Sequence, residues 1–218
     1  MKNDLPPAST ALPTNSLVPG AAPALEVNIT AALASVDVMH HGRKATIMRN
    51  QNQSNTVNSD FAKTSRKCPP FCIQPGELAP GVNTIGELEV LQFLKKINDG
   101  DASIMIVDSR TPDWVKKGTI PGTMNIPWDL LDVDKSGSAA VQEVLQKQLG
   151  ARQQDGFWNF EDAKTLVLFC NGPWCGQSPT NIKALLKIGY PAHKLLWYRG
   201  GMKDWESLGL TAIKPERE

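Results

Sequence analysis

The chain has 218 residues, of which 41% are hydrophobic and 21% are charged, and its formal net charge is +1 at pH 7. This length allows one domain with a sizeable core plus appendages, and the near-neutral charge gives no reason to expect binding to nucleic acid or to an anionic membrane. The longest apolar stretches, 103–107 and 165–170, are far shorter than the roughly 20 residues of a membrane-spanning helix. The four cysteines, too few for a disulfide scaffold, form two close pairs, Cys68 with Cys72 and Cys170 with Cys175.

Residues 1–25 are rich in proline and alanine and have no apolar periodicity, so we expect a disordered arm. No continuous apolar segment follows Lys2, so the arm is not itself a secretory signal. Arms of this composition often follow a cleaved signal, and Met1 is then interpreted as replacing a removed one. We therefore expect a periplasmic or otherwise exported protein, with a cytoplasmic location as the alternative.

Residues 26–81 are expected to form a β-rich extension that includes the first cysteine pair. Four apolar side chains alternate with polar ones on either side of the sequence HHGR, namely Val36, Val38, Ala45 and Ile47. This alternation predicts a hairpin with its turn at 40–43, where His40 and His41 would be solvated. A lone hairpin is marginally stable in water, so this one should pack on the larger domain.

A helix is expected after Thr84, because Glu87 follows it at the spacing of a capping box. The apolar face of that helix would comprise Leu88, Val90, Leu91 and Leu94. The sequence Asp-Gly-Asp at 99–101 should end the helix. The apolar run 103–107 is then suited to a strand that is covered on both faces.

Helices and strands continue to alternate along the rest of the chain. The expected elements are a helix over 139–149, a strand over 165–169, a helix from Ser178 to Gly189 and a strand over 195–198. Ser178 followed by Pro179 is typical of an N-cap and a first helical residue. Such alternation predicts an α/β domain with a parallel sheet flanked by helices, over residues 82–214.

Cys170 is the candidate nucleophile. Ligands of open parallel sheets bind beyond the carboxyl ends of the strands, and Cys170 follows the expected strand 165–169 directly. Glycines at 172 and 176 would let backbone amides point inward as an anion-binding nest, and the next helix adds its positive dipole end. Both effects favour the thiolate, which is the nucleophilic form of cysteine.

Three motifs resemble those of the rhodanese family, in the correct order. IVDSRTPDWVKKGTIPGTMNIP (106–127) is similar to the family's Asp-x-Arg strand end and Gly-His-Ile-Pro turn, and LVLFC ends at the cysteine position. YRGGMKDWESLG (198–209) resembles the closing Gly-Gly motif. The resemblance implies a rhodanese-like fold and a sulfurtransferase. Cys170 would take sulfane sulfur from thiosulfate, a polysulfide or a protein persulfide, hold it as a persulfide, and pass it to a thiol or cyanide-like acceptor.

The loop after Cys170 departs from the family pattern. Ser178 takes the place of the family's Ser or Thr, which makes the loop two residues longer than usual, and Gln177 stands where arginine is common. Related phosphatases need that arginine to clamp phosphate, so phosphatase activity is not expected. The expected substrate-binding residues are Asn171, Gly172, Trp174, Gly176, Gln177 and Arg199. No cofactor is implied, and a partner protein is a further candidate ligand.

Two other functions remain open at this point. Cys175 lies five positions after Cys170 and would either form a redox disulfide with it, resolve its persulfide, or simply pack in the loop beside Trp174. A non-catalytic domain that carries sulfur or binds a partner is the third possibility. Arg199 would face an anionic donor or form a surface ion pair, whereas Arg110 is interpreted as structural, through Asp108.

Cys68 and Cys72 are separated by three residues, two of them prolines that stiffen the backbone. A disulfide in an oxidising compartment is the favoured interpretation. No metal is expected, because a zinc site needs four ligands and the remaining histidines and cysteines lack regular spacing. A third hypothesis is that this segment packs over the Cys170 loop and exchanges sulfur or disulfides with it.

Overall fold

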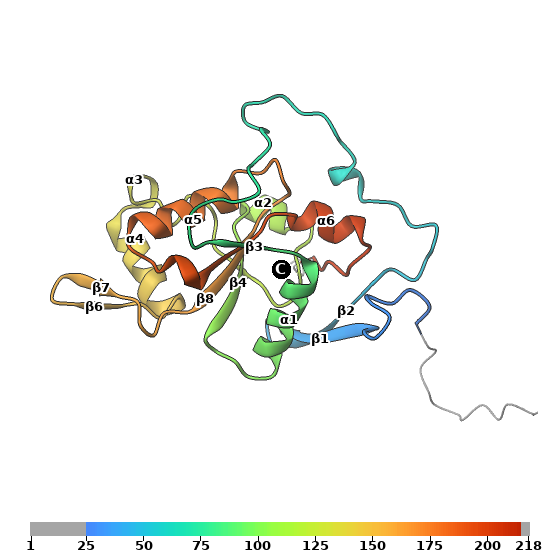
Figure 1. Ribbon diagram of the computed structural model, residues 1–218, viewed down its shortest axis with the longest axis horizontal. Helices are drawn as coiled ribbons and strands as arrows, with labels where there is room; N and C mark the ends of the chain where they lie inside the picture. Colours follow the sequence, from blue (N-terminus) through green and yellow to red (C-terminus); the bar gives the residue numbers. More distant parts are fainter. Residues whose placement is uncertain (1–24, 215–218) are drawn as a thin grey trace, which may run out of the picture.

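The computed structural model describes residues 25–214, so the arm predicted at 1–25 lies almost wholly outside the described residues. A five-stranded parallel sheet forms the centre of the domain (Figure 1). In spatial order its strands are β3 (Asn83–Ile85), β9 (Leu195–Tyr198), β8 (Thr165–Phe169), β4 (Ile104–Asp108) and β5 (Met124–Asn125). The predicted α/β fold with a parallel sheet is therefore confirmed.

Both faces of the sheet are covered, as the apolar runs predict. Along β8, Leu166 and Leu168 join one hydrophobic core, and the alternate residues Val167 and Phe169 join the other. The first core packs under α4 (Ser138–Glu143), the π-helical turn η2 (Val144–Gln148) and α5 (Gln177–Lys187). The second packs under α1 (Glu87–Asn98), α6 (Gly201–Ser207) and the N-terminal hairpin.

The N-terminal hairpin is present as predicted. Strands β1 (Ser35–His40) and β2 (Arg43–Met48) are antiparallel, and the turn between them is made by His41 and Gly42, both at positive φ. Val36, Val38 and Ile47 are buried in the second core beside α1. The hairpin thus gains stability from packing on the rest of the domain rather than standing alone.

The predicted capping box at Thr84 is wrong. Thr84 lies in β3, where it pairs with Trp197, and its hydroxyl donates to the Gly76 carbonyl at 2.6 Å. The helix begins two residues later, after Gly86, whose N–H donates to the Glu89 carboxylate at 3.0 Å. A strand pairing with a distant segment therefore takes Thr84 out of the helix. Of the apolar face predicted for this helix, Val90, Leu91 and Leu94 are buried, whereas Leu88 is 46% exposed.

Several short elements have no clear signal in the sequence. They are η1 (Ser59–Phe61), α2 (Pro112–Val115), α3 (Val133–Ser136), η3 (Ala192–Lys194) and a second hairpin of β6 (Arg152–Gln154) and β7 (Phe157–Asn159). The second hairpin projects from the side of the domain (Figure 1). The helix expected over 139–149 is split into α4 and the π-helical turn.

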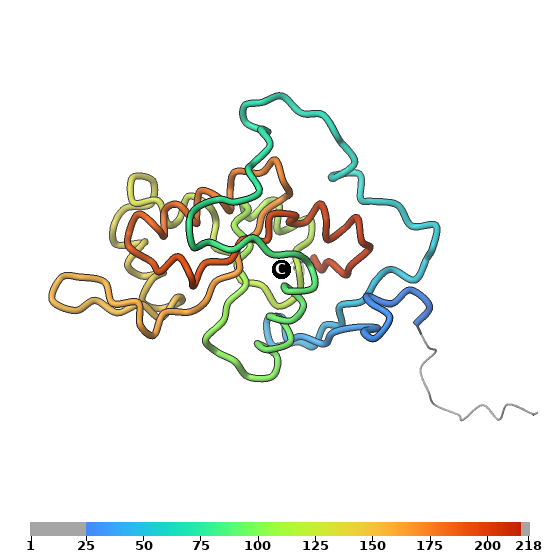
Figure 2. The backbone as a smooth tube through the Cα atoms, viewed as in Figure 1, coloured from blue at the N-terminus to red at the C-terminus, as the bar shows by residue number. Residues whose placement is uncertain are grey.

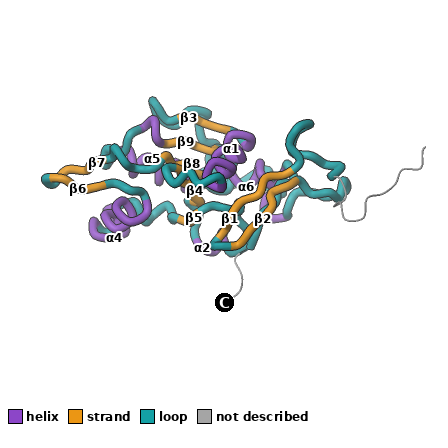
Figure 3. Tube along the Cα trace, turned by 90° about the horizontal axis from the view of Figure 1, so that it is seen from below, coloured by secondary structure: helices purple, strands orange, loops and turns teal. Residues whose placement is uncertain are grey.

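Residues 49–82 form a long connection with little regular structure, which follows the outside of the domain before it enters β3 (Figure 2). Seen from below, the strands of the sheet follow one another from β3 to β5, with the β1–β2 hairpin toward one end of the molecule and the β6–β7 hairpin at the other (Figure 3). Phe61 is buried and anchors the connection to the second core. No helix among residues 25–214 is both long and apolar enough to cross a bilayer.

Candidate active site

Cys170 is the first residue after β8, and the loop 170–176 leads from it to α5. Its side chain lies almost entirely inside the protein, with 2% exposed. The start of the loop is fixed to α6, because Met202 N–H donates to the Cys170 carbonyl and Lys203 N–H to the Asn171 carbonyl, both at 3.0 Å. Cys175 N–H closes the loop on Gly172 O at 2.8 Å. The nucleophile predicted from the sequence is therefore held by two elements.

Gly201 makes the close approach between α6 and the loop possible. Its φ is +54°, and a Cβ at this position would overlap the Cys170 carbonyl. We expect Gly201→Ala to lower the free energy of unfolding. The backbone strain of alanine at positive φ costs about 1–3 kcal/mol, and the overlap with the Cys170 carbonyl adds to this cost. Chemical denaturation measures the loss. Gly76→Ala is the control, since a Cβ there meets nothing within 4 Å; equal losses in both variants would contradict the prediction.

The surroundings of Cys170 favour its thiolate. Burial alone would raise the pKa of Cys170, but hydrogen bonds from the Cys175 thiol, the Ser178 hydroxyl and the amides of Ser178 and Gly172 lower it below its usual value. The Ser178 hydroxyl donates to Cys170 Sγ at 3.1 Å. The predicted nest is thus present in part, as two amides that favour the ionised sulfur.

Ser178 has a different role from the one predicted. The first helical residue of α5 is Gln177 and its N-cap is Gly176, so Ser178 lies inside the first turn. Its hydroxyl oxygen accepts a hydrogen bond from Trp197 Nε1 at 3.1 Å, which leaves the hydroxyl proton directed at Cys170. Trp197, in an apolar strand, gave no sign of this role. Gly176 has φ −87°, a conformation open to any residue, so the curl of the loop does not depend on glycine there.

Cys175 forms an asymmetric pair with Cys170. Its hydrogen bond to Cys170, its burial and the nearby thiolate charge all raise the pKa of Cys175. Cys175 is therefore the cysteine of the pair that keeps its proton, and its thiol donates to Gln177 Oε1 at 3.7 Å. Cys170 Sγ lies 3.4 Å from the Cys175 carbonyl, to which it donates while it is a thiol. Both cysteines are free thiols in this structure.

Arg110 joins the end of β4 to the neighbouring loops. Its guanidinium binds both carboxylate oxygens of Asp108, with a shortest distance of 2.6 Å, and both side chains are 1% exposed. It also donates to the Gly118 carbonyl at 2.7 Å and to Asn171 Oδ1 at 3.3 Å. These contacts agree with the structural role predicted for Arg110, and they extend it to the Cys170 loop.

Among residues 25–214, Arg199 binds backbone carbonyls and forms no surface ion pair, the alternative role considered for it. Its Nη2 donates to the Gln74 carbonyl at 2.9 Å and its Nε to the Pro75 carbonyl at 3.0 Å. The other expected substrate-binding residues share one loop and helix start with Cys170: Asn171, Gly172, Trp174, Gly176 and Gln177. Their contact with a substrate, and that of Arg199, stays a prediction.

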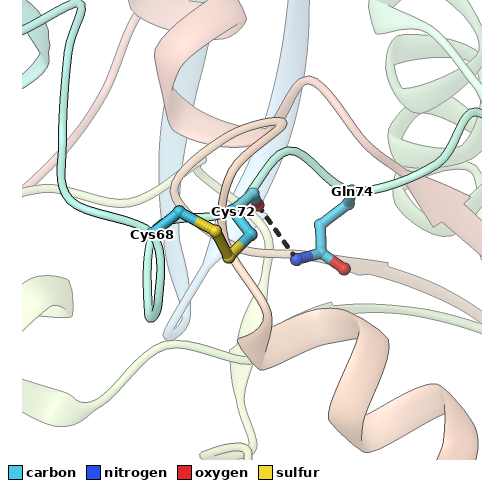
Figure 4. Close-up of a disulfide and its surroundings, with 3 residues drawn as sticks. All are labelled: Cys68, Cys72 and Gln74. Atoms are coloured by element: carbon cyan, nitrogen blue, oxygen red, sulfur yellow. Dashed lines mark hydrogen bonds between the residues drawn. A yellow bond between two sulfur atoms is a disulfide. The ribbon is translucent and has the colours of Figure 1, made fainter.

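A disulfide joins Cys68 and Cys72 (Figure 4). The segment that carries it lies against the Cys170 loop, because Gln74 N–H donates to the Pro173 carbonyl at 2.8 Å. This is the packing that one of the sequence hypotheses requires. Within residues 25–214, no group of three or more His, Cys, Asp or Glu side chains is placed to hold a metal ion.

Comparison with known proteins places this site in a family. A model of the rhodanese-like domain matches residues 89–208, more than half of the chain. A solved thiosulfate sulfurtransferase from Pseudomonas aeruginosa is 19% identical, with a TM-score of 0.40, over 63% of this chain and 21% of that chain. A human single-domain sulfurtransferase is 23% identical, with a TM-score of 0.38, over 57% of this chain and 95% of that chain. No curated protein matches. The chain belongs to the rhodanese-like domain family.

Proposed function

We propose that the protein is a sulfurtransferase that moves sulfane sulfur from a donor to a thiophilic acceptor through a persulfide on Cys170. The observation that carries the proposal is the buried cysteine at the end of β8, whose Sγ accepts a hydrogen bond from the Ser178 hydroxyl at 3.1 Å. Despite burial, this bond and the amides of Ser178 and Gly172 lower the pKa of Cys170. Thiosulfate, polysulfides and protein persulfides are the donor classes, and thiols or cyanide are the acceptors. A partner protein is a candidate for either role.

The reaction has two displacement steps. The Cys170 thiolate attacks the outer sulfur of thiosulfate, the sulfur–sulfur bond breaks with its electron pair, and sulfite leaves. The terminal sulfur of the persulfide is then attacked by cyanide or a thiolate, which restores the Cys170 thiolate. Amides that favour one sulfur anion would favour the charged persulfide as well.

Mass spectrometry tests this function directly. After incubation with thiosulfate or a polysulfide, the Cys170 peptide should gain one sulfur atom, and cyanide should remove it as thiocyanate. Cys170→Ser should lose the adduct completely, since serine cannot form a persulfide. Absence of the adduct on the wild-type protein with every donor class would reject the proposal.

A redox reaction of Cys170 with Cys175 is a second candidate function. It is favoured by the proximity of two free cysteines on one loop, with Cys170 Sγ 3.4 Å from the Cys175 carbonyl, and by a pKa that is lowered at Cys170 and raised at Cys175. An oxidant such as a disulfide or a peroxide would take up two electrons, and the Cys175 thiol would lose its single proton, as the Cys170 thiolate and Cys175 form a disulfide. A Cys175→Ser variant separates the functions, because it should retain sulfur transfer and lose the disulfide. If Cys175 resolves the persulfide, hydrosulfide should be released from the wild type alone.

We also propose that the protein works in an oxidising compartment, the periplasm or beyond. The Cys68–Cys72 disulfide supports this, because cytosolic thiols are usually kept reduced. Trapping of thiols in intact cells, followed by mass spectrometry, should find both cysteines unmodified. Full modification of Cys68 and Cys72 would point to the cytoplasm instead.

A further inference from the structure

We propose that residues 66–75, the strap, control access to Cys170, and that Arg66 is the positioning residue that keeps Trp174 on the Cys170 loop. Reduction of the Cys68–Cys72 disulfide would release the strap and expose the thiolate. The biological meaning of this control rests on the proposed function. The access itself can be measured without any sulfur transfer.

Arg66 provides the first contact between the strap and the loop. Its guanidinium carbon lies 5.0 Å from the ring centroid of Phe71 and 5.6 Å from that of Trp174. One cation therefore makes attractive cation–π contacts with an aromatic ring of the strap and with one of the loop. Arg66 Nη2 also donates to the Asp60 carbonyl at 3.3 Å, which fixes the guanidinium from the other side.

Trp174 covers the part of the loop that stabilises the thiolate. A Cβ built on Gly172 would lie 3.0 Å from Trp174 Cη2, so the indole packs directly on this glycine. The Gly172 amide is one of the groups that lower the pKa of Cys170. Trp174 is half-buried, whereas Cys170 beneath the loop is 2% exposed. Movement of the indole is therefore a direct route to the sulfur.

The other end of the strap is anchored twice. Gln74 N–H donates to the Pro173 carbonyl at 2.8 Å, and Arg199, which follows β9, binds the carbonyls of Gln74 and Pro75. The disulfide closes the chain between Arg66 and Gln74, and the Gln74 side-chain amide donates to the Cys72 carbonyl at 3.1 Å (Figure 4). The disulfide therefore restricts the conformational freedom of the strap between its two contacts with the loop, that of Arg66 with Trp174 and that of Gln74 with Pro173.

The exposure of the four cysteines gives the order of reaction. Cys68 is exposed and Cys72 half-buried, whereas both loop cysteines are buried, so a dithiol reductant meets the strap first. One thiolate of the reductant attacks Cys68 Sγ and Cys72 leaves as a thiolate that takes up a proton. The second thiol of the reductant then displaces Cys68. Two electrons pass from the dithiol, which becomes a disulfide, and the strap is left with two thiols.

The experiment measures the alkylation rate of Cys170 by iodoacetamide, followed by peptide mass spectrometry. We expect an increase of about fivefold or more in Arg66→Ala and in the double variant Cys68→Ser/Cys72→Ser, because a lost contact of about 1 kcal/mol changes an opening equilibrium by that factor. Adding Arg66→Ala to the double variant should give no further increase, since both changes release the same strap. Arg66→Lys, which keeps a cation over the rings, should restore part of the protection.

Arg152→Ala is the matched control, because that arginine forms an exposed ion pair with Asp162 on the β6–β7 hairpin. Wild-type alkylation rates in either Arg66→Ala or the double serine variant overturn the proposal. So does a rate increase that rises steeply with low concentrations of urea, which would indicate global unfolding instead of release of the strap. Failure of the proposed function would look different: no persulfide would form on Cys170 in any variant, while the alkylation rates would still report the strap.

Discussion

A Ser178→Ala variant is expected to raise the pKa of Cys170 and to move the pH profile of its alkylation toward higher pH. The lost hydrogen bond, 3.1 Å from Oγ to Sγ, acts on the charged form of the sulfur. Such bonds contribute about 1.5–3 kcal/mol. Removing a group that stabilises the thiolate moves the pKa upward, so alkylation slows at pH values near the midpoint of the profile.

The measurement is the rate of Cys170 alkylation as a function of pH, with the midpoint taken as the apparent pKa. Ser178→Thr keeps a hydroxyl and should keep a midpoint near that of the wild type. Trp197→Phe removes the donor that orients Ser178, and it should shift the midpoint in the same direction by a smaller amount. A slower reaction of Ser178→Ala with an unchanged midpoint would show that the hydroxyl acts on the shape of the loop and not on the charge.

Arg110→Ala is expected to lower the free energy of unfolding by about 3–5 kcal/mol, because it leaves the Asp108 carboxylate buried without its partner. Both side chains are 1% exposed, so water cannot replace the lost guanidinium. For a chain of this size the midpoint of thermal unfolding should fall on the order of 10 °C. Since Arg110 also holds Asn171 Oδ1, the remaining folded protein should show a shifted Cys170 reactivity.

Two further variants test whether the loss of stability comes from burial of the Asp108–Arg110 ion pair, as opposed to the loss of any ion pair. Arg152→Ala breaks a pair whose side chains are 74% and 60% exposed, and it should cost less than about 1 kcal/mol. A double variant, Asp108→Leu/Arg110→Met, leaves no unpaired charge and should lose less than the sum of the single variants. Equal losses for Arg110→Ala and Arg152→Ala would contradict the prediction.

Local patterns were sufficient for the central elements of the fold. The strands 165–169 and 195–198 are continuous apolar runs, and burial on both faces of a parallel sheet requires this composition. The N-terminal hairpin follows from alternation of apolar and polar residues around a turn. The start of α1 did not follow from its pattern, because pairing of Thr84 with Trp197 joins segments more than a hundred residues apart.

The candidate nucleophile follows from residues that are close in sequence: an apolar strand, Cys170, a glycine-containing loop and a helix. The groups that orient Ser178 and anchor the strap come from elsewhere in the chain. Trp197 reaches Ser178 from another strand, and the guanidinium of Arg199, predicted to face a substrate, is bonded to strap carbonyls. Amino-acid order alone thus predicts the fold class, which the structure confirms, and indicates Cys170 as the candidate nucleophile, since both inferences depend on short-range patterns. Only tertiary packing decides where the Ser178 proton points and that the strap lies over the loop, because those contacts join distant segments.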